Sequence, residues 1–418
     1  MGAFGRRAPW PATEGSAPWQ EAVPRSPQLP PKTWGSTLES TVLVGHRCLV
    51  RPRVDAMSNH VEVTMSLRSP SRGKLITLLL AAALTAALPA AAQQQRVLRL
   101  ISDRTDQGTL RPILDAFEQA SGAKVEGVFM DQGLVNRLES RPTEADVVIT
   151  KDAELMEIAA ERGLLARLES PRIKAAVPAQ FVGTNDMFYV DAYRARVIFY
   201  SRERVKPSEL STYADLASPK WKGRICIRSG SHDYNLALFG QFIASYGEDE
   251  ARRVIGGIAA NLARKPQGND REQARGIHEG KCDVALMNTY YHPLMQGNPA
   301  QKAWADSVGV FFPDQAGKGT FIMRSAVGVT KAKGNRDLAL QLAEFMVSRE
   351  AQELMVNRTR QYSVLPDVPV HPQMVSLGAE QGLTDGRFKM DFVPLAALAG
   401  KREVAIRLVD SVGFDSGF

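Results

Sequence analysis

The chain has 418 residues, which is enough for two or three domains and a large buried core. Its formal net charge of +7 is concentrated near the amino terminus, because residues 1–92 hold ten Lys and Arg against five Asp and Glu and leave 42 against 40 in the remainder. The balance of +2 over residues 93–418 argues against a nucleic-acid-binding protein.

A secretory signal peptide is predicted at residues 65–92. Basic residues within 68–74 precede an apolar run over residues 75–88, and small residues up to Ala92 supply a cleavage site. The apolar run is about 14 residues long, shorter than the roughly 20 that a membrane span needs. We therefore expect an exported protein, with an uncut, membrane-anchored form as the alternative.

Residues 1–64 precede this signal, although a signal peptide normally begins the chain. They are rich in Pro, Gly, Ser and Trp and show no helical or strand periodicity. We interpret residues 1–64 as a disordered, non-native upstream extension that arises from an early start codon. Met57 and Met65 are candidates for the true start.

Strands and helices are predicted to alternate from residue 93 to about residue 163. The predicted strands cover residues 96–101, 124–130 and 145–149, and the predicted helices cover residues 110–117, 134–138 and 155–159. Gly122 and Gly163 are expected to end the first and last of these helices. Such alternation is typical of an open α/β sheet.

The alternation restarts after Tyr189. Helices are predicted at residues 210–216, 235–246, 248–262, 271–279, 337–347 and 351–356, and strands at residues 224–228, 283–287, 308–312 and 325–329. Two α/β blocks of this size predict two lobes with a cleft between them. Ligands bind preferentially in such clefts, beyond the carboxyl ends of the strands.

A pair of adjacent tyrosines is the unusual feature of the second block. Tyr290 and Tyr291 directly follow the predicted strand 283–287, so both phenols should lie at its carboxyl end. Tyr234 follows the predicted strand 224–228 in the same way. A lone Tyr-Tyr dipeptide is usually structural, but a third tyrosine in a matching position favours a ligand-binding role.

Phenolate oxygens suit a small trivalent cation, which is a hard acid and prefers charged oxygen donors to imidazole or thiolate. A free phenol has a pKa near 10, but a bound cation stabilises the phenolate. Three phenolates would neutralise a 3+ ion and leave coordination positions for an anion or water. Arginine is the natural partner for such an anion, because its guanidinium presents a planar fork of donors.

The cysteines of the second block repeat the spacing of the tyrosines. Cys226 and Cys282 each precede a tyrosine, Tyr234 and Tyr290 respectively, by eight residues. Two cysteines of an exported protein can form a disulfide. If strands 224–228 and 283–287 are neighbours in one sheet, the cysteines are expected to be bridged and the tyrosines to converge.

Enzymatic motifs do not appear in residues 93–418. We find no GxSxG elbow, P-loop, HExxH motif or GxGxxG turn after a strand, and the four histidines have no metal-ligand spacing.

Several segments, in order along the chain, resemble the periplasmic ferric-iron-binding proteins of bacterial ABC importers. The similarity extends from about residue 97 to residue 364. Its motifs are residues 210–216, 219–223, 228–235, 267–270, 285–291 and 308–313.

The resemblance implies a transferrin-like α/β fold, the type II periplasmic-binding fold, with two lobes, two crossing strands and a hinged cleft. Lobe 1 would contain residues 93–190 and about 315–365, and lobe 2 residues 191–314 and about 366–418 with C-terminal helices. The protein would be a periplasmic monomer without enzymatic activity. It would close on Fe(III) and deliver the ion to an inner-membrane ABC permease.

The resemblance also implies that Tyr234, Tyr290 and Tyr291 ligate the ferric ion. Some family members add a histidine or tyrosine from lobe 1, and Thr105 and Asp106 occupy those positions here. We therefore expect either a site completed by a synergistic anion, such as carbonate, or a carboxylate ligand from Asp106. The first is the favoured interpretation.

Two arginines are the expected partners of that anion, namely Arg104 and Arg196. Tyr189 and Asp152 are expected to have structural roles, as a packing aromatic at the lobe junction and as a helix N-cap. The leading alternative function is a periplasmic binding protein for an organic anion or another metal ion. An envelope enzyme that uses the cleft as an active site is a further, weaker alternative.

Overall fold

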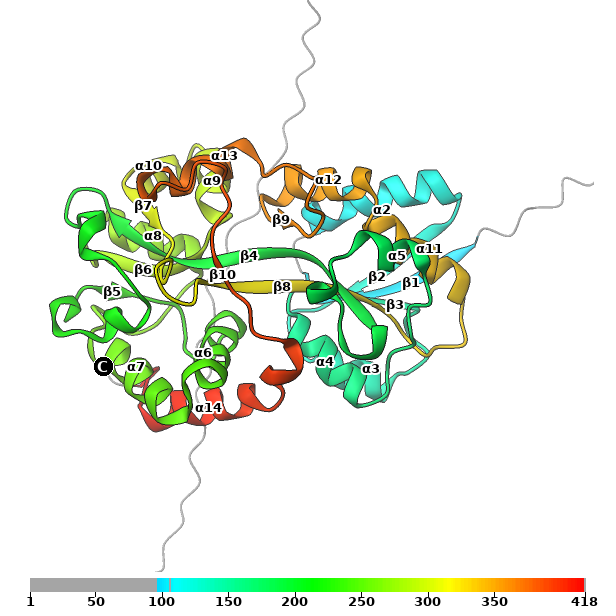
Figure 1. The fold of residues 1–418 in the computed structure, drawn as a ribbon, viewed down its shortest axis with the longest axis horizontal. Helices are drawn as coiled ribbons and strands as arrows, with labels where there is room; N and C mark the ends of the chain where they lie inside the picture. Colours follow the sequence, from blue (N-terminus) through cyan, green and yellow to red (C-terminus); the bar gives the residue numbers. More distant parts are fainter. Residues whose placement is uncertain (1–95, 105–106, 417–418) are drawn as a thin grey trace, which may run out of the picture. The chain divides into compact units, whose positions relative to one another are not determined.

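Two long antiparallel strands, β4 (Phe188–Ser201) and β8 (Thr320–Val329), form the centre of the fold (Figure 1). The computed structural model describes residues 96–104 and 107–416. All residues of β4 and β8 are buried. The first half of β4 pairs with β8, whereas its second half pairs with β6 and β7. The two strands therefore connect two α/β regions.

The described residues belong to one compact unit. Three sequence predictions lie outside them, namely the upstream extension (1–64), the signal peptide (65–92) and the proposed carboxylate ligand Asp106. Within the part of the chain that the structure describes, no helix is both long and apolar enough to cross a membrane.

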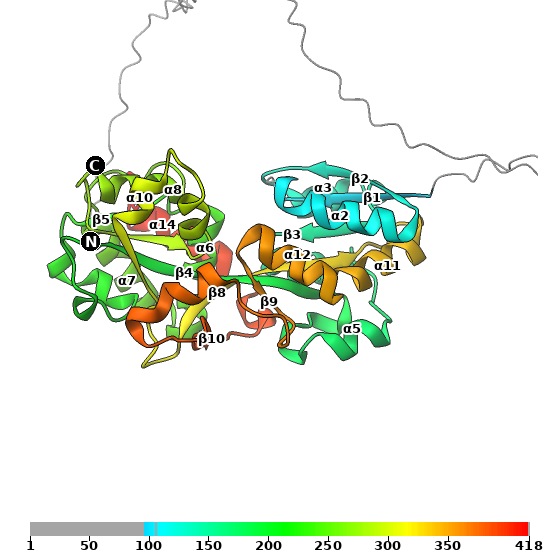
Figure 2. The same cartoon turned by 90° about the horizontal axis from the view of Figure 1, so that it is seen from above.

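The first region contains a parallel sheet in the order β2–β1–β3, which the end of β8 extends. β1 (Val97–Ser102) pairs in parallel with β2 (Lys124–Phe129) and β3 (Val147–Thr150), and β3 pairs antiparallel with β8. Helices pack around this sheet (Figure 2). They are α2 (Gln107–Ser121), α3 (Leu134–Ser140), α4 (Ala153–Glu161), α5 (Pro171–Ala176), α11 (Arg336–Met346) and α12 (Arg349–Thr359).

The second region uses the other half of β4, which pairs antiparallel with β6 (Val284–Asn288) and β7 (Val308–Phe311). β5 (Ile225–Cys226) pairs in parallel with β6. The helices of this region are α6 (Asp233–Tyr246), α7 (Glu248–Ala260), α8 (Asp270–His278), α9 (Tyr291–Gln296), α10 (Lys302–Asp306) and α14 (Lys401–Ser411). The C-terminal helix α14 packs against α6 and α7.

Short elements complete the fold around the crossing strands. β9 (Tyr362–Ser363) pairs with β4, and β10 (Met390–Asp391) pairs with β8. The remaining short helix is α13 (Pro372–Val375), and the 3-10 helices are Ala179–Phe181, Thr184–Asp186, Pro207–Glu209, Ala214–Ala217, Pro219–Trp221, Ser376–Gln381 and Leu395–Leu398.

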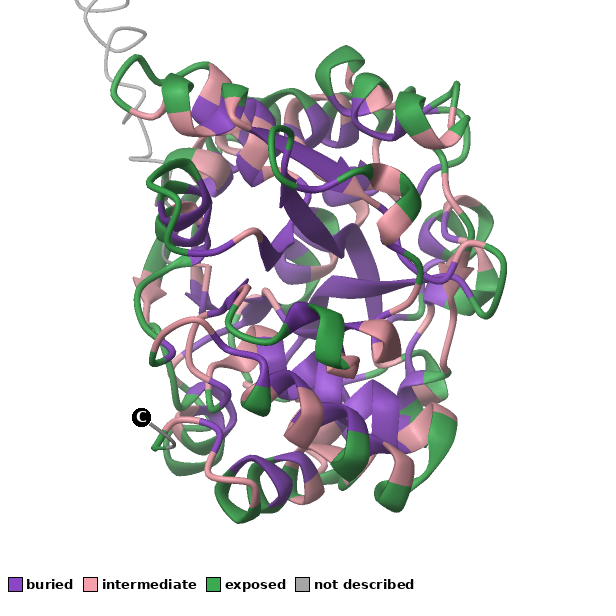
Figure 3. Cartoon of the chain, turned by 90° about the vertical axis from the view of Figure 1, so that its left-hand side faces the viewer, coloured by how far each residue is buried: buried purple, intermediate pink, exposed green. Residues whose placement is uncertain are grey.

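The apolar periodicity that predicted the helices also places them on the core. In α2, Leu110, Ile113, Leu114 and Phe117 recur at helical spacing, and none is more than 2% exposed. Gly122 ends this helix as predicted, with a φ of +66° that glycine adopts without steric cost. Figure 3 shows the buried strands inside and the exposed faces of the helices outside.

One predicted helix is wrong, and one long strand was missed. Residues 210–216 do not form an α-helix, because local side-chain bonds hold an irregular path: the backbone N–H of Tyr213 donates to Asp314 and that of Asp215 donates to Thr212. The strand β4 was not predicted from the apolar pattern, although the resemblance implied two crossing strands. Its sequence includes two buried arginines, Arg194 and Arg196, which interrupt the apolar pattern of a buried strand.

Candidate metal centre

Three tyrosine side chains meet where two neighbouring strands end. β5 and β6 are parallel, with Cys226 opposite Ala285, so their carboxyl ends open on the same edge of the sheet. The hydroxyl oxygens of Tyr234 and Tyr290 lie 3.3 Å apart. The ring centroids of Tyr290 and Tyr291 lie 4.3 Å apart. The structure thus brings together the three tyrosines that the sequence singled out.

Helix starts hold these side chains in place. Tyr234 lies in the first turn of α6, where the Nδ1 atom of His232 accepts a hydrogen bond of 3.1 Å from the Tyr234 N–H. Burial and the charge of Arg228 lower the pKa of His232 to about 4, so the imidazole is neutral and able to accept this bond. Tyr291 is the first residue of α9 and Tyr290 precedes it directly.

The phenols of Tyr290 and Tyr291 have raised pKa values, so both are neutral without a bound cation. Burial raises the pKa of Tyr290 well above its ordinary value, and the neighbouring phenols of Tyr234 and Tyr291 raise it further. Burial likewise raises the pKa of Tyr291. A cation between the hydroxyl groups would reverse this preference and convert the phenols to phenolates.

Guanidinium groups surround the tyrosine rings. The Cζ atoms of Arg194, Arg196 and Arg228 lie 5.5, 5.8 and 5.0 Å from the centroid of the Tyr234 ring. The Cζ atom of Arg271 lies 4.8 Å from that of the Tyr291 ring. These distances fall within the range of about 6 Å for cation–π attraction. The positive charge also favours any ionised form of the phenols.

A cavity of about 310 Å³ lies in front of the tyrosines, and both regions contribute to its walls. The basic side chains that line it outnumber the acidic ones. The basic residues are Arg104, Lys151, Arg194, Arg228 and Arg271, and the acidic residues are Asp103 and Asp131. The cavity is therefore suited to an anionic ligand or to a cation that arrives together with an anion.

Arg104 lies in the cavity wall, where the sequence predicted an anion partner. Its Nη2 atom donates to both carboxylate oxygens of Asp191, at 2.7 and 2.8 Å. Its buried Nε atom has no hydrogen-bond partner among the described residues. Part of the guanidinium thus remains available to a ligand.

Arg196 does not line the cavity, and the structure corrects its assignment as an anion partner. The side chain is fully buried behind Tyr234. All three guanidinium nitrogens donate inside the protein, and the acceptors are Asn235, Asp270, Asn288 and the carbonyl oxygen of Leu286. No nitrogen is left for an anion, because Arg196 lies roughly 7 Å further along the extended strand than Arg194, inside the second region.

Arg194 is the arginine of β4 that reaches the cavity, and sequence reasoning missed it. Its Nη1 atom donates to the hydroxyl of Ser325 at 3.0 Å and its Nη2 atom to the carbonyl oxygen of Lys151 at 2.7 Å. Its buried Nε atom has no partner among the described residues, and no ion pair within them joins Arg194 to a carboxylate. The signal available in the sequence was an arginine within the mostly apolar run of residues 188–201.

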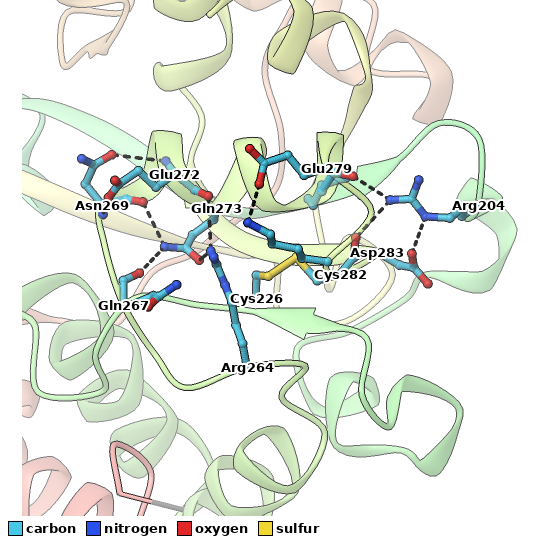
Figure 4. The surroundings of a disulfide bond; sticks show 12 residues. Arg204, Cys226, Arg264, Gln267, Asn269, Glu272, Gln273, Glu279, Cys282 and Asp283 are labelled. Atoms are coloured by element: carbon cyan, nitrogen blue, oxygen red, sulfur yellow. Dashed lines mark hydrogen bonds and ion pairs between the residues drawn. A yellow bond between two sulfur atoms is a disulfide. The ribbon is translucent and has the colours of Figure 1, made fainter. Parts of the chain in front are cut away.

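Cys226 and Cys282 are joined by a disulfide, with their Cα atoms 5.7 Å apart (Figure 4). The bond fastens β5 to the segment that leads into β6. Asp283, directly after Cys282, accepts hydrogen bonds of 2.6 Å from both Arg204 and Arg224. The disulfide thus joins the last residue of β5 to the segment before β6, at the end of β6 away from Tyr290.

The two expected structural residues are found in such roles. Asp152 is the N-cap of α4, because its carboxylate accepts a hydrogen bond from the Glu154 N–H. Tyr189 is fully buried, and its hydroxyl donates to the carbonyl oxygen of Ala343 at 2.5 Å. Among residues 96–104 and 107–416, no group of three or more His, Cys, Asp or Glu side chains is arranged to hold a metal ion.

Ion pairs join the two regions at one edge of the cavity. The Nζ atom of Lys151, after β3, lies 3.3 Å from Asp233 at the start of α6. Asp233 also pairs with Arg402 of α14, and the Nη1 atom of Arg402 lies 3.2 Å from Asp152. These four residues form a chain of three ion pairs, two of which join the regions, and Asp233 directly precedes Tyr234.

Comparisons with known proteins show which family the chain resembles. Residues 143–379 match the family model described as bacterial extracellular solute-binding protein. The chain is 38% identical over 285 residues to iron uptake protein A1 of Synechocystis, covering 67% of this chain and 77% of that protein. These matches identify the family.

Solved structures extend the similarity to three dimensions. Apo ferric ion-binding protein A of Pasteurella haemolytica superposes with a TM-score of 0.70 and 35% identity, covering 77% of this chain and 98% of that one. A Trichodesmium protein in complex with iron and citrate gives a TM-score of 0.68 and 34% identity, covering 76% and 99%. The predicted α/β fold with two lobes, the type II periplasmic-binding fold, is confirmed by these similarities.

Proposed function

The chain belongs to the family of bacterial extracellular solute-binding proteins, and on that premise we propose that it captures ferric iron in the cavity between its two regions. The family binds solutes and is not enzymatic, which removes the envelope-enzyme alternative. The observation that carries the proposal is the convergence of Tyr234, Tyr290 and Tyr291 at one wall of the cavity. Similar proteins are named for iron uptake and ferric iron binding.

In the proposed site, the three phenolates ligate Fe(III). They supply three negative charges, which neutralise the ion, and they are the hard oxygen donors that a trivalent cation prefers. The hydroxyl oxygens of Tyr234 and Tyr290 are already 3.3 Å apart, so a single ion placed between them can bond to both. Binding releases the phenolic protons, and iron affinity therefore falls as the pH is lowered.

A synergistic anion completes this site. Arg194 lacks a carboxylate partner among the described ion pairs, and Asp270 alone compensates both Arg196 and Arg228. After the phenolates have neutralised the ferric ion, a charge of about +2 remains from these three arginines. A divalent anion such as carbonate would balance that charge, with Arg194 and Arg104 as its partners. Arg194 thereby takes the role first assigned to Arg196.

We propose that the two regions act as lobes that close on the ion around β4 and β8. Residues 93–190 with about 315–365 would form lobe 1, and residues 191–314 with about 366–418 would form lobe 2. The protein would be a periplasmic monomer, exported by the signal peptide at residues 65–92, that delivers iron to an inner-membrane ABC permease. Family membership supports a transporter partner.

A binding protein for an organic anion is the second candidate, and the five basic side chains around the cavity favour it. Replacing Tyr290 and Tyr291 together by Phe distinguishes the two functions. The double variant should lose Fe(III) binding if the phenols are ligands, whereas an organic anion held by the arginines should still bind. Isothermal titration with Fe(III) and with citrate alone measures both outcomes, and unchanged Fe(III) binding would contradict our proposal.

A further inference from the structure

Arg196 and Asp270 form an ion pair that neither reaches the cavity nor touches solvent. Both side chains are fully buried, and the Nη1 atom of Arg196 lies 3.2 Å from Oδ2 of Asp270. A buried ion pair contributes little net stability, because taking both charges out of water costs as much as their attraction returns. The hydrogen bonds of this pair fix the positions of the groups around it, and those groups carry the tyrosines.

The pair contacts each segment that carries a tyrosine. Arg196 donates to Oδ1 of Asn235, the residue after Tyr234, at 2.8 and 3.1 Å. It also donates to Oδ1 of Asn288, two residues before Tyr290, at 3.1 Å. Asp270 in turn accepts a hydrogen bond of 2.9 Å from the backbone N–H of Asn288.

Asp270 also orients the cations that face the site. Its Oδ1 atom accepts a hydrogen bond of 3.1 Å from Nη1 of Arg228, whose guanidinium lines the cavity and lies over the Tyr234 ring. Asp270 begins α8, and the next residue, Arg271, lies over the Tyr291 ring. One carboxylate thus holds two arginines and the start of the helix that supplies a third.

We infer that Arg196 and Asp270 are positioning residues for the iron site, which set the separation of the three phenols and keep a net positive charge behind Tyr234. The inference rests on the proposed function, because it acts through the tyrosine ligands. It assigns to Arg196 a role different from anion binding. Residues that orient metal ligands typically change metal affinity by about 10- to 100-fold when replaced.

The test compares Arg196→Met with Arg204→Met in the full exported protein. Arg204 is a suitable control because it braces the opposite end of β6, through Asp283 and the carbonyl oxygens of Ile277 and Cys282. Three quantities are measured for each: the thermal midpoint of the iron-free protein, the Fe(III) affinity by competition with citrate, and the visible tyrosinate-to-iron absorption band.

Arg196→Met is expected to weaken Fe(III) binding by about 10- to 100-fold and to shift the absorption band of whatever iron remains bound. Arg204→Met is expected to lower the thermal midpoint while leaving the band and the affinity within about twofold of the wild type. An Arg196→Met protein whose band and affinity match those of the control would overturn the inference.

Two more conservative variants test the inference if Arg196→Met does not fold. Arg196→Lys keeps the charge but lacks the planar fork that reaches Asn235, Asp270 and Leu286 together. Asp270→Asn removes the shared carboxylate. Both should shift the band, and an unshifted band in both contradicts positioning. A wild-type protein without any band would instead refute the tyrosine site itself, so the two failures are distinguishable.

Discussion

The two sides of the cavity differ in chemistry. The second region supplies the three phenols from strand ends and helix starts that a buried ion pair and a disulfide hold together. The first region supplies charged side chains, and none of its described residues that line the cavity is a tyrosine. We therefore propose that the second region binds the metal, whereas the first completes the site through an anion and through ion pairs.

The charged side of the cavity is organised around Asp103. Its carboxylate accepts hydrogen bonds from the backbone N–H of Lys151 at 2.6 Å and from the hydroxyl of Thr150 at 2.9 Å. Burial raises the pKa of Asp103. Burial alone would lower the pKa of Lys151, but the combined charges of Asp103 and Asp233 raise it, so this lysine stays charged. Lys151 is thus a cation in the wall of the cavity that the tyrosines also line.

Replacing a phenol should have the largest effect on iron binding. Tyr290→Phe removes one ligand, so we expect Fe(III) affinity to fall by more than about 100-fold, beyond the loss typical of residues that only orient a ligand. The visible tyrosinate band should weaken or disappear. Tyr246→Phe is the control, because Tyr246 is 44% exposed and lies on α6 at the end away from the cavity. Equal Fe(III) affinities of the two variants would contradict a ligand role for Tyr290.

Replacing Arg194 should have the next largest effect on Fe(III) affinity. We expect this effect to arise only from loss of the contact between Arg194 and the anion. Arg194→Met leaves all three phenols in place but removes an uncompensated cation from the cavity wall. We expect carbonate to increase the Fe(III) affinity of the wild type by about 10-fold or more and to have little effect on the variant, in line with a charge-assisted contact. Titrations with and without bicarbonate measure this. A variant that keeps the full carbonate effect would show that the anion lies elsewhere.

Removing an ion pair between the regions should have a smaller effect on iron binding. Asp233→Asn breaks the ion pair with Lys151, which joins the regions, and the ion pair with Arg402, which lies within the second region. Lys151 and Arg402 are at most 14% exposed. We expect iron release to a chelator to become a few times faster, because each partly buried pair contributes on the order of 1 kcal/mol. Asp306→Asn, which breaks an exposed pair with Lys302 on α10, is the control and should leave the release rate unchanged. Stopped-flow release that is equally fast in both would contradict a role for these ion pairs.

A final substitution should leave iron binding unchanged and affect only stability. Burial, reinforced by the charge of Asp152, raises the pKa of Glu154 to about 8. The folded protein therefore keeps this proton up to about pH 8, whereas the unfolded chain loses it near pH 4.5. The free energy of unfolding should fall as the pH rises between these values, by on the order of 5 kcal/mol. Glu154→Gln should flatten this dependence in chemical denaturation at pH 5 and pH 8, and an unchanged slope would contradict it.

The sequence predicted most of the second region's site, because its signals are local. A strand followed directly by tyrosines, as at Tyr290 and Tyr291, places phenols at the edge of a sheet whatever surrounds them. The matching position of Tyr234 required only that β5 and β6 be neighbours. The α/β fold followed from apolar periodicities such as that of α2, which depend on few long-range contacts.

The crossing strand and its arginines could not be predicted in the same way. β4 is buried along its whole length, yet Arg194 and Arg196 interrupt the apolar run that would indicate such a strand. These charges are tolerated because partners distant in the sequence, Asp270 for Arg196 and Ser325 for Arg194, accept their hydrogen bonds. Only one of these two arginines, Arg194, lines the cavity. The reason is the point at which β4 passes from one region to the other, which is a property of tertiary structure.

A titration of the iron-free protein with Fe(III), followed by visible absorption in the presence and absence of bicarbonate, tests the central claim most directly. We expect a tyrosinate-to-iron band that grows to one equivalent of iron when the anion is present and that is weak or absent without it. Iron that binds tightly at one equivalent without producing any such band would contradict a site built from Tyr234, Tyr290 and Tyr291.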